Sequence, residues 1–273
     1  SGEVTFGGRD LTRLPERALR GVRGKDIAVV FQDSLAALNP LHRVGAQVTE
    51  MIHAHRRMPR ARATDRAVDL FAEVGIASPR ANARALPHQL SGGMRQRVMI
   101  AMGLANDPAV LVADEPTTAL DVTIQAQVLS VLRRARDDHG TAVLLITHDL
   151  GVVAEVADRV AVMYAGRIVE QGTRDDVLLD PQHPYTVGLL GSVPPVDGPV
   201  TDRLPAIPGA PLTGVDRPAG CAFAARCVHA RDACVERPAL RRRHGGPGHL
   251  DACLLPRSVR RPAHTERDLT RDE

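Results

Sequence analysis

Three short apolar runs stand out along the chain and predict the strands of a sheet. They occupy residues 27–31, 110–113 and 141–146. Runs of this length, apolar at consecutive rather than alternate positions, are typical of strands buried on both faces of a parallel sheet. The pattern therefore predicts an α/β fold in which helices cover a parallel sheet.

Between these runs, apolar residues recur three and four positions apart, as they do on one face of a helix. A loop is expected at 34–40 before the first of these helices, and Gly140 is expected to end the last. The stripes are Val44, Val48, Met51, Ile52 and His55; then Ala67, Leu70, Phe71 and Val74; a segment up to Leu104; and finally Ile124, Val128, Leu129, Val131 and Leu132.

The N-terminal residues 2–6 predict a short strand, and residues 10–20 a connection of helical character. After the third run, residues 150–157 predict a helix, and residues 159–164 and 167–170 a hairpin.

From about residue 180 the composition changes, because prolines become frequent. Such a segment favours an extended, irregular region wrapped on a core over an independent helical domain. We therefore expect one domain at 1–179, with a helical subdomain at about 40–105, and an extension at 180–273.

Composition narrows the class of protein. A chain of 273 residues can bury one substantial core plus a smaller appendage, and with no Trp, two Tyr and four Phe that core must be aliphatic. The net charge of +3 is small, Lys25 is the only lysine, and no dense basic run indicates nucleic acid. No stretch approaches the roughly 18 consecutive apolar residues of a membrane span, and no signal peptide is present, so a cytoplasmic chain is expected.

Two stretches carry candidate phosphate chemistry. Ser91, Gly92 and Gly93 lead into a predicted helix, where free backbone N–H groups at the positive dipole end can bind an anion. Asp114 and Glu115 follow the second apolar run, at the strand edge where α/β sheets place their ligands. One carboxylate can hold Mg²⁺ and the other can orient an attacking water. Each stretch alone is common in proteins of other function.

Taken in order with residues 117–121 and 146–149, these stretches resemble the ATP-binding cassette (ABC) ATPases. The resemblance implies a P-loop NTPase-like (RecA-like) parallel sheet that binds ATP and Mg²⁺. It assigns residues 90–96, including Ser91, Gly92, Gly93 and Gln96, to the signature motif and Ala119 to Asp121 to the D-loop. It identifies Asp114 as the Walker B aspartate and Glu115 as the catalytic glutamate. It identifies His148 as the switch histidine and Gln32 as the Q-loop glutamine, and it implies that Asp114 and Gln32 are the residues that bind Mg²⁺.

Further segments narrow the resemblance to the ATPase subunits of oligopeptide and dipeptide importers. They are residues 37–40, 87–89, 124–127, 183–186, 220–223 and 226–227. The narrower resemblance implies a peripheral subunit on the cytoplasmic face of a bacterial inner membrane, with two permease subunits, a second ATPase subunit and an extracytoplasmic solute-binding protein. Peptide is the leading substrate; nickel or another small solute is the alternative.

In that family two ATPase domains meet head to tail. The resemblance therefore implies that Ser91 and Gly93 contact nucleotide held by the partner subunit, whereas Asp114 and Glu115 serve nucleotide on their own subunit. A cassette ATPase of DNA repair or translation is a weaker alternative, because those proteins lack segments like 183–186 and the cysteine-containing tail.

One departure from the family is clear: no Gly-x-x-x-x-Gly-Lys-Ser/Thr occurs, and Lys25 lies in Gly24-Lys25-Asp26. We expect a chain lacking an N-terminal portion with the phosphate-binding loop and a central strand. Such a chain would be nucleotide-free and poorly stable, and it would not hydrolyse ATP alone. The apolar edges of the strands beside the missing one would be exposed unless another segment covers them. A non-hydrolysing subunit that only donates its signature motif is the corresponding alternative.

The four cysteines, Cys221, Cys227, Cys234 and Cys253, all lie in the proline-rich region. A disulfide pair is disfavoured in a reducing cytoplasm, and four thiolates would cross-link an otherwise poorly ordered segment. The sequence therefore predicts a metal centre. Resemblance to the peptide importers implies a [4Fe–4S] cluster, with zinc as the alternative.

Overall fold

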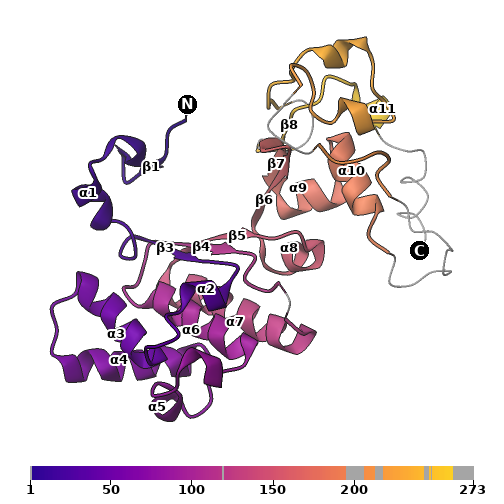
Figure 1. Cartoon of the computed structure of the whole chain (residues 1–273). Helices are drawn as coiled ribbons and strands as arrows, with labels where there is room; N and C mark the ends of the chain where they lie inside the picture. Colours follow the sequence, from indigo (N-terminus) through magenta and orange to yellow (C-terminus); the bar gives the residue numbers. More distant parts are fainter. Residues whose placement is uncertain are drawn as a thin grey trace. The chain divides into compact units, whose positions relative to one another are not determined.

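The computed structural model describes residues 2–118, 120–194, 206–212, 218–242, 246 and 248–260. The chain divides into two compact units, one ending at His148 and one beginning at Asp149 (Figure 1). Among the described residues, no helix has both the length and the apolar character needed to cross a bilayer.

The first unit is built on a parallel sheet of three strands, β3 (Ile27–Val30), β4 (Val110–Asp114) and β5 (Ala142–Ile146), in the order β3-β4-β5. Val29, Val112 and Leu144 share one row of the ladder. The predicted α/β fold with a parallel sheet is confirmed.

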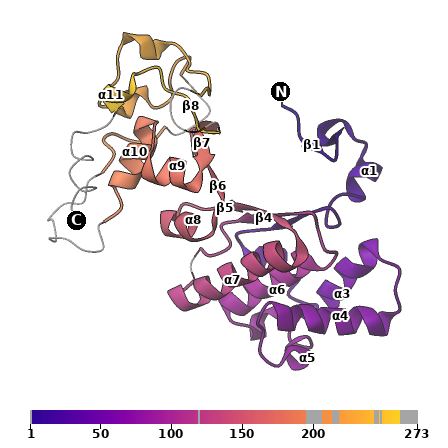
Figure 2. The ribbon, with the colours of Figure 1, turned by 180° about the vertical axis from the view of Figure 1, so that it is seen from behind.

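Two helices, α6 (Gly92–Leu104) and α7 (Val122–His139), cover one face of this sheet (Figure 2). The packing of α6 is close, since a Cβ on Gly103 would lie 3.0 Å from Leu111 Cδ1 and 3.3 Å from Val30 Cγ2. As predicted, α7 ends at Gly140, whose left-handed φ of 66° suits a residue without a side chain.

The opposite face of the sheet is apolar and exposed. Val29 is 43% exposed, Phe31 56%, Leu144 56% and Ile146 45%. The prediction of strands buried on both faces is therefore wrong for this face, because α6 and α7 cover only the other one. The expected exposure of apolar strand edges concerns the edges of the sheet rather than this face, and it stays a prediction.

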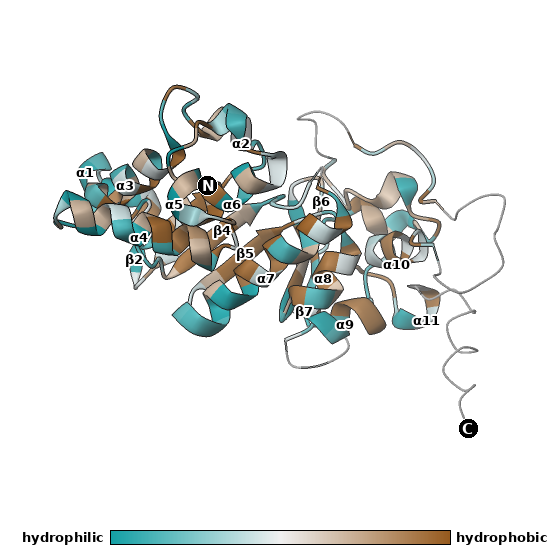
Figure 3. Ribbon diagram, turned by 90° about the horizontal axis from the view of Figure 1, so that it is seen from below, coloured by the Kyte–Doolittle hydropathy of each residue, from teal (hydrophilic) through white to brown (hydrophobic). Residues whose placement is uncertain are grey.

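A helical insert follows β3. It comprises α2 (Ser34–Ala37), α3 (Val44–His55), α4 (Arg60–Glu73) and α5 (Pro79–Asn82), and α3 and α4 pack on each other and on α6. Both long helices were predicted, whereas the predicted loop at 34–40 contains the short helix α2. Figure 3 shows polar residues on the outer surfaces of α4 and α7. The apolar core of the insert is Val44, Val48, Ile52, Ala67, Leu70 and Phe71.

The N-terminal segment contributes a small hairpin, β1 (Thr5–Phe6) with β2 (Arg9–Asp10). A 3-10 turn (Leu11–Arg13) and helix α1 (Glu16–Arg20) follow it. Both the short strand and the helical connection agree with the sequence pattern.

The second unit begins with α8 (Leu150–Val156) and the predicted hairpin, β6 (Arg159–Tyr164) with β7 (Arg167–Thr173). The two-residue strand β8 (Leu250–Asp251) pairs with β7, and α9 (Arg174–Leu179) packs beside β7. The rings of Tyr164, Tyr185 and Phe223 meet in the core of this unit.

The region after residue 180 is less irregular than predicted, because α10 (Pro184–Gly191) lies within it. Proline is compatible with a first helical position, and the His183 ring caps the helix by accepting the N–H of Tyr185. The other elements described after residue 191 are two 3-10 turns (Ala224–Arg226 and Asp232–Val235) and the short helix α11 (Arg257–Arg260); a further 3-10 turn, Pro87–Gln89, precedes α6.

A buried carboxylate links β7 to later parts of the chain. Glu170 is fully buried and accepts the backbone N–H groups of Gln182 at 2.6 Å and His183 at 2.9 Å. Its Oε1 also lies 2.7 Å from Nε2 of His249, which precedes β8. One side chain thus satisfies three polar groups from two segments.

Candidate active site

Three predicted residues meet where the strands of the parallel sheet end. Gln32 follows β3, Glu115 follows β4 and His148 follows β5. Gln32 Nε2 donates to Glu115 Oε2 at 2.8 Å, and His148 Nδ1 lies 3.3 Å from Glu115 Oε1. Because parallel strands bring their carboxyl ends to one edge, residues 83 and 33 positions apart in the chain converge on one carboxylate.

Thr118 completes this cluster and was not predicted. Its hydroxyl donates to Glu115 Oε2 at 2.9 Å, and its N–H donates to the Glu115 carbonyl at 3.2 Å. The signal in the sequence is a hydroxyl three residues after a carboxylate at the start of a turn, a pattern too common to identify a site.

Glu115 has a left-handed backbone conformation, with φ of 45°. This region costs a residue other than glycine about 1–3 kcal/mol, and such residues are concentrated at functional sites. The N–H of Glu115 remains bonded to the Ile146 carbonyl at 2.9 Å, so β5 fixes the turn that aims the side chain.

The electrostatics of the cluster favour an ionised carboxylate. The hydrogen bond from Thr118, and next the one with His148, lower the pKa of Glu115, and burial opposes them. Glu115 is a proton acceptor at neutral pH. The His148 side chain is 73% exposed and can reach groups outside the cluster.

Asp114 ends β4 beside this cluster, half-buried. Within the described residues its carboxylate makes no hydrogen bond or ion pair, so both of its oxygens are available to coordinate a metal ion. Gln32 uses its amide nitrogen on Glu115 and retains its carbonyl oxygen. One or two protein oxygens with several waters are the usual setting for Mg²⁺, so these residues fit the predicted metal.

The predicted anion site lies at the start of α6. Ser91 caps the helix by accepting the N–H of Met94 at 3.3 Å. Gly93 is required by packing as well, because a Cβ there would lie 2.4 Å from Ile124 Cγ2 of α7. Gln96 is buried at 5% exposure, and its amide nitrogen has no hydrogen-bond partner among the described residues.

Asp121 caps α7 by accepting the N–H of Ile124 at 2.9 Å. Ala119, the other end of the predicted D-loop, lies outside the described residues. Gly93 and Asp121 thus both meet Ile124, which ties the start of α6 to the start of α7.

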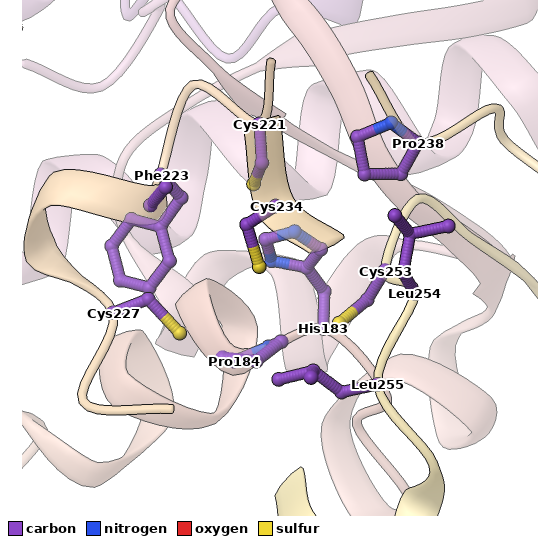
Figure 4. Close-up of a pocket in the computed structure, with 11 residues that line it drawn as sticks. His183, Pro184, Cys221, Phe223, Cys227, Cys234, Pro238, Cys253, Leu254 and Leu255 are labelled. Atoms are coloured by element: carbon purple, nitrogen blue, oxygen red, sulfur yellow. The ribbon is translucent and has the colours of Figure 1, made fainter. Parts of the chain in front are cut away.

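The four cysteines line one pocket, as Figure 4 shows; we call it the thiol pocket. The N–H of Cys221 donates to the Cys234 carbonyl at 2.9 Å, and His183 and Phe223 complete the walls. Burial is the main cause that raises the pKa values of Cys221 and Cys227.

The thiol pocket does not have the geometry of a metal centre. Its cavity has a volume of about 10 Å³, room for roughly one water. In the part of the chain that the structure describes, no group of three or more His, Cys, Asp or Glu is placed to hold a metal ion. The predicted gathering of the cysteines is present, but the predicted [4Fe–4S] or zinc centre is not supported.

A groove of about 540 Å³ in the helical insert was not predicted; we call it the arginine groove. Arg80 is paired with Asp65 at 3.1 Å, whereas the other three arginines make no ion pair among the described residues. The polar and charged residues that line it are Arg43, Thr49, Glu50, His53, Arg60, Thr64, Arg80 and Arg84.

Comparison with known proteins gives two family matches. Residues 1–118 match the family described as ABC transporter. Residues 169–234 match the family described as oligopeptide/dipeptide transporter, C-terminal region.

Individual relatives agree. The chain is 52% identical over 229 residues to the oligopeptide transport ATP-binding protein OppD of Bacillus subtilis, covering 84% of this chain and 64% of that protein. It is 51% identical over 253 residues to the probable peptide ABC transporter ATP-binding protein y4tR of Sinorhizobium fredii, covering 92% and 75%. Among solved structures, the ATP-binding cassette MJ0796 bound to ADP and Pi matches with a TM-score of 0.58 at 28% identity, over 64% of this chain and 74% of that chain.

Proposed function

This chain belongs to the family of ATP-binding subunits of oligopeptide and dipeptide ABC transporters, and from that premise we propose that it supplies ATP hydrolysis to a peptide importer. The observation that carries the proposal is the carboxylate of Glu115, held between Gln32 and His148 at the ends of three parallel strands. Its relatives are named for peptide transport, which supports peptide as the solute.

Glu115 acts as the general base in this proposal. Its ionised carboxylate takes a proton from the water that attacks the γ-phosphate, and the left-handed turn fixes its direction. His148 lies against the same carboxylate and is exposed enough to contact phosphate. Asp114 and the Gln32 carbonyl oxygen would hold Mg²⁺, which supplies charge neutralisation of the phosphates.

The start of α6 serves a different nucleotide, the one held by a second ATP-binding subunit. Ser91 and the free N–H groups behind it offer the donors and the positive dipole end that bind a phosphate. The 273 residues contain no Gly-x-x-x-x-Gly-Lys-Ser/Thr, and in this proposal the second subunit carries the loop that holds the nucleotide contacted by Ser91.

Turnover measurements test the proposal. We expect no ATP hydrolysis by the 273-residue chain alone, and hydrolysis when it is mixed with a second ATP-binding subunit that carries the loop. Robust turnover by the chain alone would contradict the first expectation. A mixture no more active than the second subunit by itself would contradict the second.

The arginine groove, lined by residues between Arg43 and Arg84, supports a contact of the helical insert with a permease subunit. Arg43, Arg60 and Arg84 offer unpaired positive charge around a cavity of about 540 Å³, which suits an acidic segment at the cytoplasmic end of a permease. This contact would place the chain on the cytoplasmic face of the membrane. A solute-binding protein on the other side would complete the importer.

Charge reversal tests this contact. Arg43→Glu with Arg84→Glu should abolish crosslinking of the insert to a permease loop, while Arg231→Glu, exposed in the second unit, should leave it intact. Crosslinks found only through the second unit would reject the arginine groove as the permease site.

The thiol pocket supports a narrower proposal, that its cysteines bind a [4Fe–4S] cluster or zinc after local opening. Four cysteines around one cavity support it, whereas the small volume and the raised pKa values of Cys221 and Cys227 oppose it. Anaerobic purification followed by iron, sulfide and zinc analysis decides the matter. A preparation free of all three would exclude both metals.

A further inference from the structure

The Glu115 carboxylate is unusual in how its two oxygens are occupied. Oε2 accepts two hydrogen bonds, from Gln32 Nε2 at 2.8 Å and from Thr118 Oγ1 at 2.9 Å. Within the part of the chain that the structure describes, Oε1 has one hydrogen-bonding neighbour, His148 Nδ1, at the longer distance of 3.3 Å. A carboxylate oxygen offers about two lone-pair sites, so Oε2 is filled and Oε1 keeps one site open.

We propose that Thr118 is a positioning residue that, together with Gln32, directs the attacking water to Oε1 of Glu115. This inference rests on the proposed function. In the resulting step the water oxygen bonds to the γ-phosphorus and its proton passes to Oε1. The bond from the γ-phosphorus to the bridging oxygen breaks, and its electron pair leaves with ADP.

The geometry explains why two donors are needed. The Glu115 side chain is only 27% exposed, yet its free rotation about the last torsion would exchange the two oxygens. Gln32 and Thr118 come from different strand ends and reach the same oxygen, so they fix the plane of the carboxylate as well as its direction. A single donor would leave that plane free to turn.

The surroundings of Thr118 agree less well with a purely structural role than with a positioning role. Thr118 is exposed, and its side chain makes no other hydrogen bond among the described residues. Its hydroxyl therefore does little to hold the fold, and its removal should leave the sheet and α7 intact.

Substitutions in a transporter whose 273-residue chain is joined to a loop-bearing N-terminal segment, so that Glu115 serves nucleotide held by its own subunit, test the proposal. Thr118→Val should lower kcat on the order of 10²-fold, the scale of a mispositioned reacting group, with little change in KM. Thr118→Ser keeps the hydroxyl and should restore kcat. Thr123→Val makes the same chemical change at an exposed position of α7 and should have no effect. In a Glu115→Gln background, Thr118→Val should cost nothing further, because the two residues act as one unit.

A spectroscopic measurement on the 273-residue chain keeps this test separate from that of the proposed function. At a fixed neutral pH, the ¹³C resonance of the Glu115 carboxyl should move in Thr118→Val and stay in place in Thr118→Ser and Thr123→Val. An unmoved resonance in Thr118→Val would overturn the inference, as would unchanged kcat in a transporter whose turnover depends on Glu115. Absence of any turnover in the unsubstituted transporter would instead reject the proposed function, and the resonance would still decide on Thr118.

Discussion

The role of Glu115 depends on its backbone conformation as much as on its side chain. Glu115 keeps a left-handed φ of 45° while its N–H stays bonded to Ile146 of β5. Nothing in the type of residue predicts such a conformation, since Glu disfavours it. The motif identified the residue, and the structure adds how the sheet holds it in position.

Two substitutions should separate the two nucleotide sites. In a mixture with a loop-bearing second subunit, Ser91→Arg should abolish the added turnover, because a bulky cation replaces the cap of α6. Glu115→Gln should leave that turnover unchanged, since Glu115 faces nucleotide of its own subunit. In a chain joined to a loop-bearing N-terminal segment, Glu115→Gln should lower hydrolysis by about 10²–10⁴-fold with ATP binding retained. ATP binding and phosphate release are measured in parallel, and the reverse pattern would exchange the two roles.

Glu170 should be the most sensitive polar position of the second unit. Glu170→Leu leaves the N–H groups of Gln182 and His183 and the ring of His249 without their acceptor, at a cost of about 3–5 kcal/mol. Both tyrosines, Tyr164 and Tyr185, lie in this unit and there is no Trp. Tyrosine fluorescence during urea unfolding therefore reports on it selectively. An unchanged midpoint would show that this buried network contributes little.

The spacing of apolar residues along the sequence predicts most of the helices and strands that the structure contains. The strands, α3, α4, α6 and α7 follow from apolar spacing, and Gly140 ends α7 as expected. The density of prolines at 180–218 predicts irregular structure and does not reveal helix α10, although Pro184 suits a first helical turn. Thr118 and the arginine groove were missed because hydrogen bonds and grooves depend on which segments meet, and that information is not local.

The stability of the contact between α6 and α7 should depend on the side-chain volume at Gly93 and Ile124. Gly93→Ala places a methyl group 2.4 Å from Ile124 Cγ2, and overpacking of this kind costs about 1–3 kcal/mol. Adding Ile124→Ala should recover most of that loss in thermal unfolding followed by circular dichroism. If phosphate binding in trans still fails in the recovered double variant, Gly93 also serves the nucleotide directly.

The start of α9 should make the second unit sensitive to acid. The Thr173 hydroxyl is the main cause that lowers the pKa of Asp176, whose carboxylate accepts the Thr173 N–H in return. A depressed pKa stabilises the fold above the unfolded-state value, and that stability is lost as pH falls through the folded-state value. Thr173→Ala should remove about 1 kcal/mol near neutral pH and less in acid. Equal losses at both pH values would contradict this origin.

At the scale of the whole molecule, the two units differ in how they bury apolar surface. The first unit covers one face of a three-stranded sheet and leaves the other open, whereas the second closes three aromatic rings into a core. Sequence reasoning placed a boundary near residue 180 by composition. In the structure, the boundary between the two compact units lies between His148 and Asp149, because the hairpin β6–β7 packs with the later segment. Local composition does not reveal such a long-range contact.

The exposed sheet face should also affect the heat capacity changes of unfolding and of binding. Val29, Phe31, Leu144 and Ile146 are already 43–56% exposed in the folded chain. Unfolding therefore gains less heat capacity from them than from buried residues, and the stability curve of the first unit should be flatter than that of a fully covered sheet. Any polypeptide that covers this face should bind with a negative heat capacity change, near −0.45 cal/mol/K for each Å² of apolar surface removed from water. Titration calorimetry at several temperatures would measure that slope, and Phe31→Ser with Leu144→Ser should reduce it.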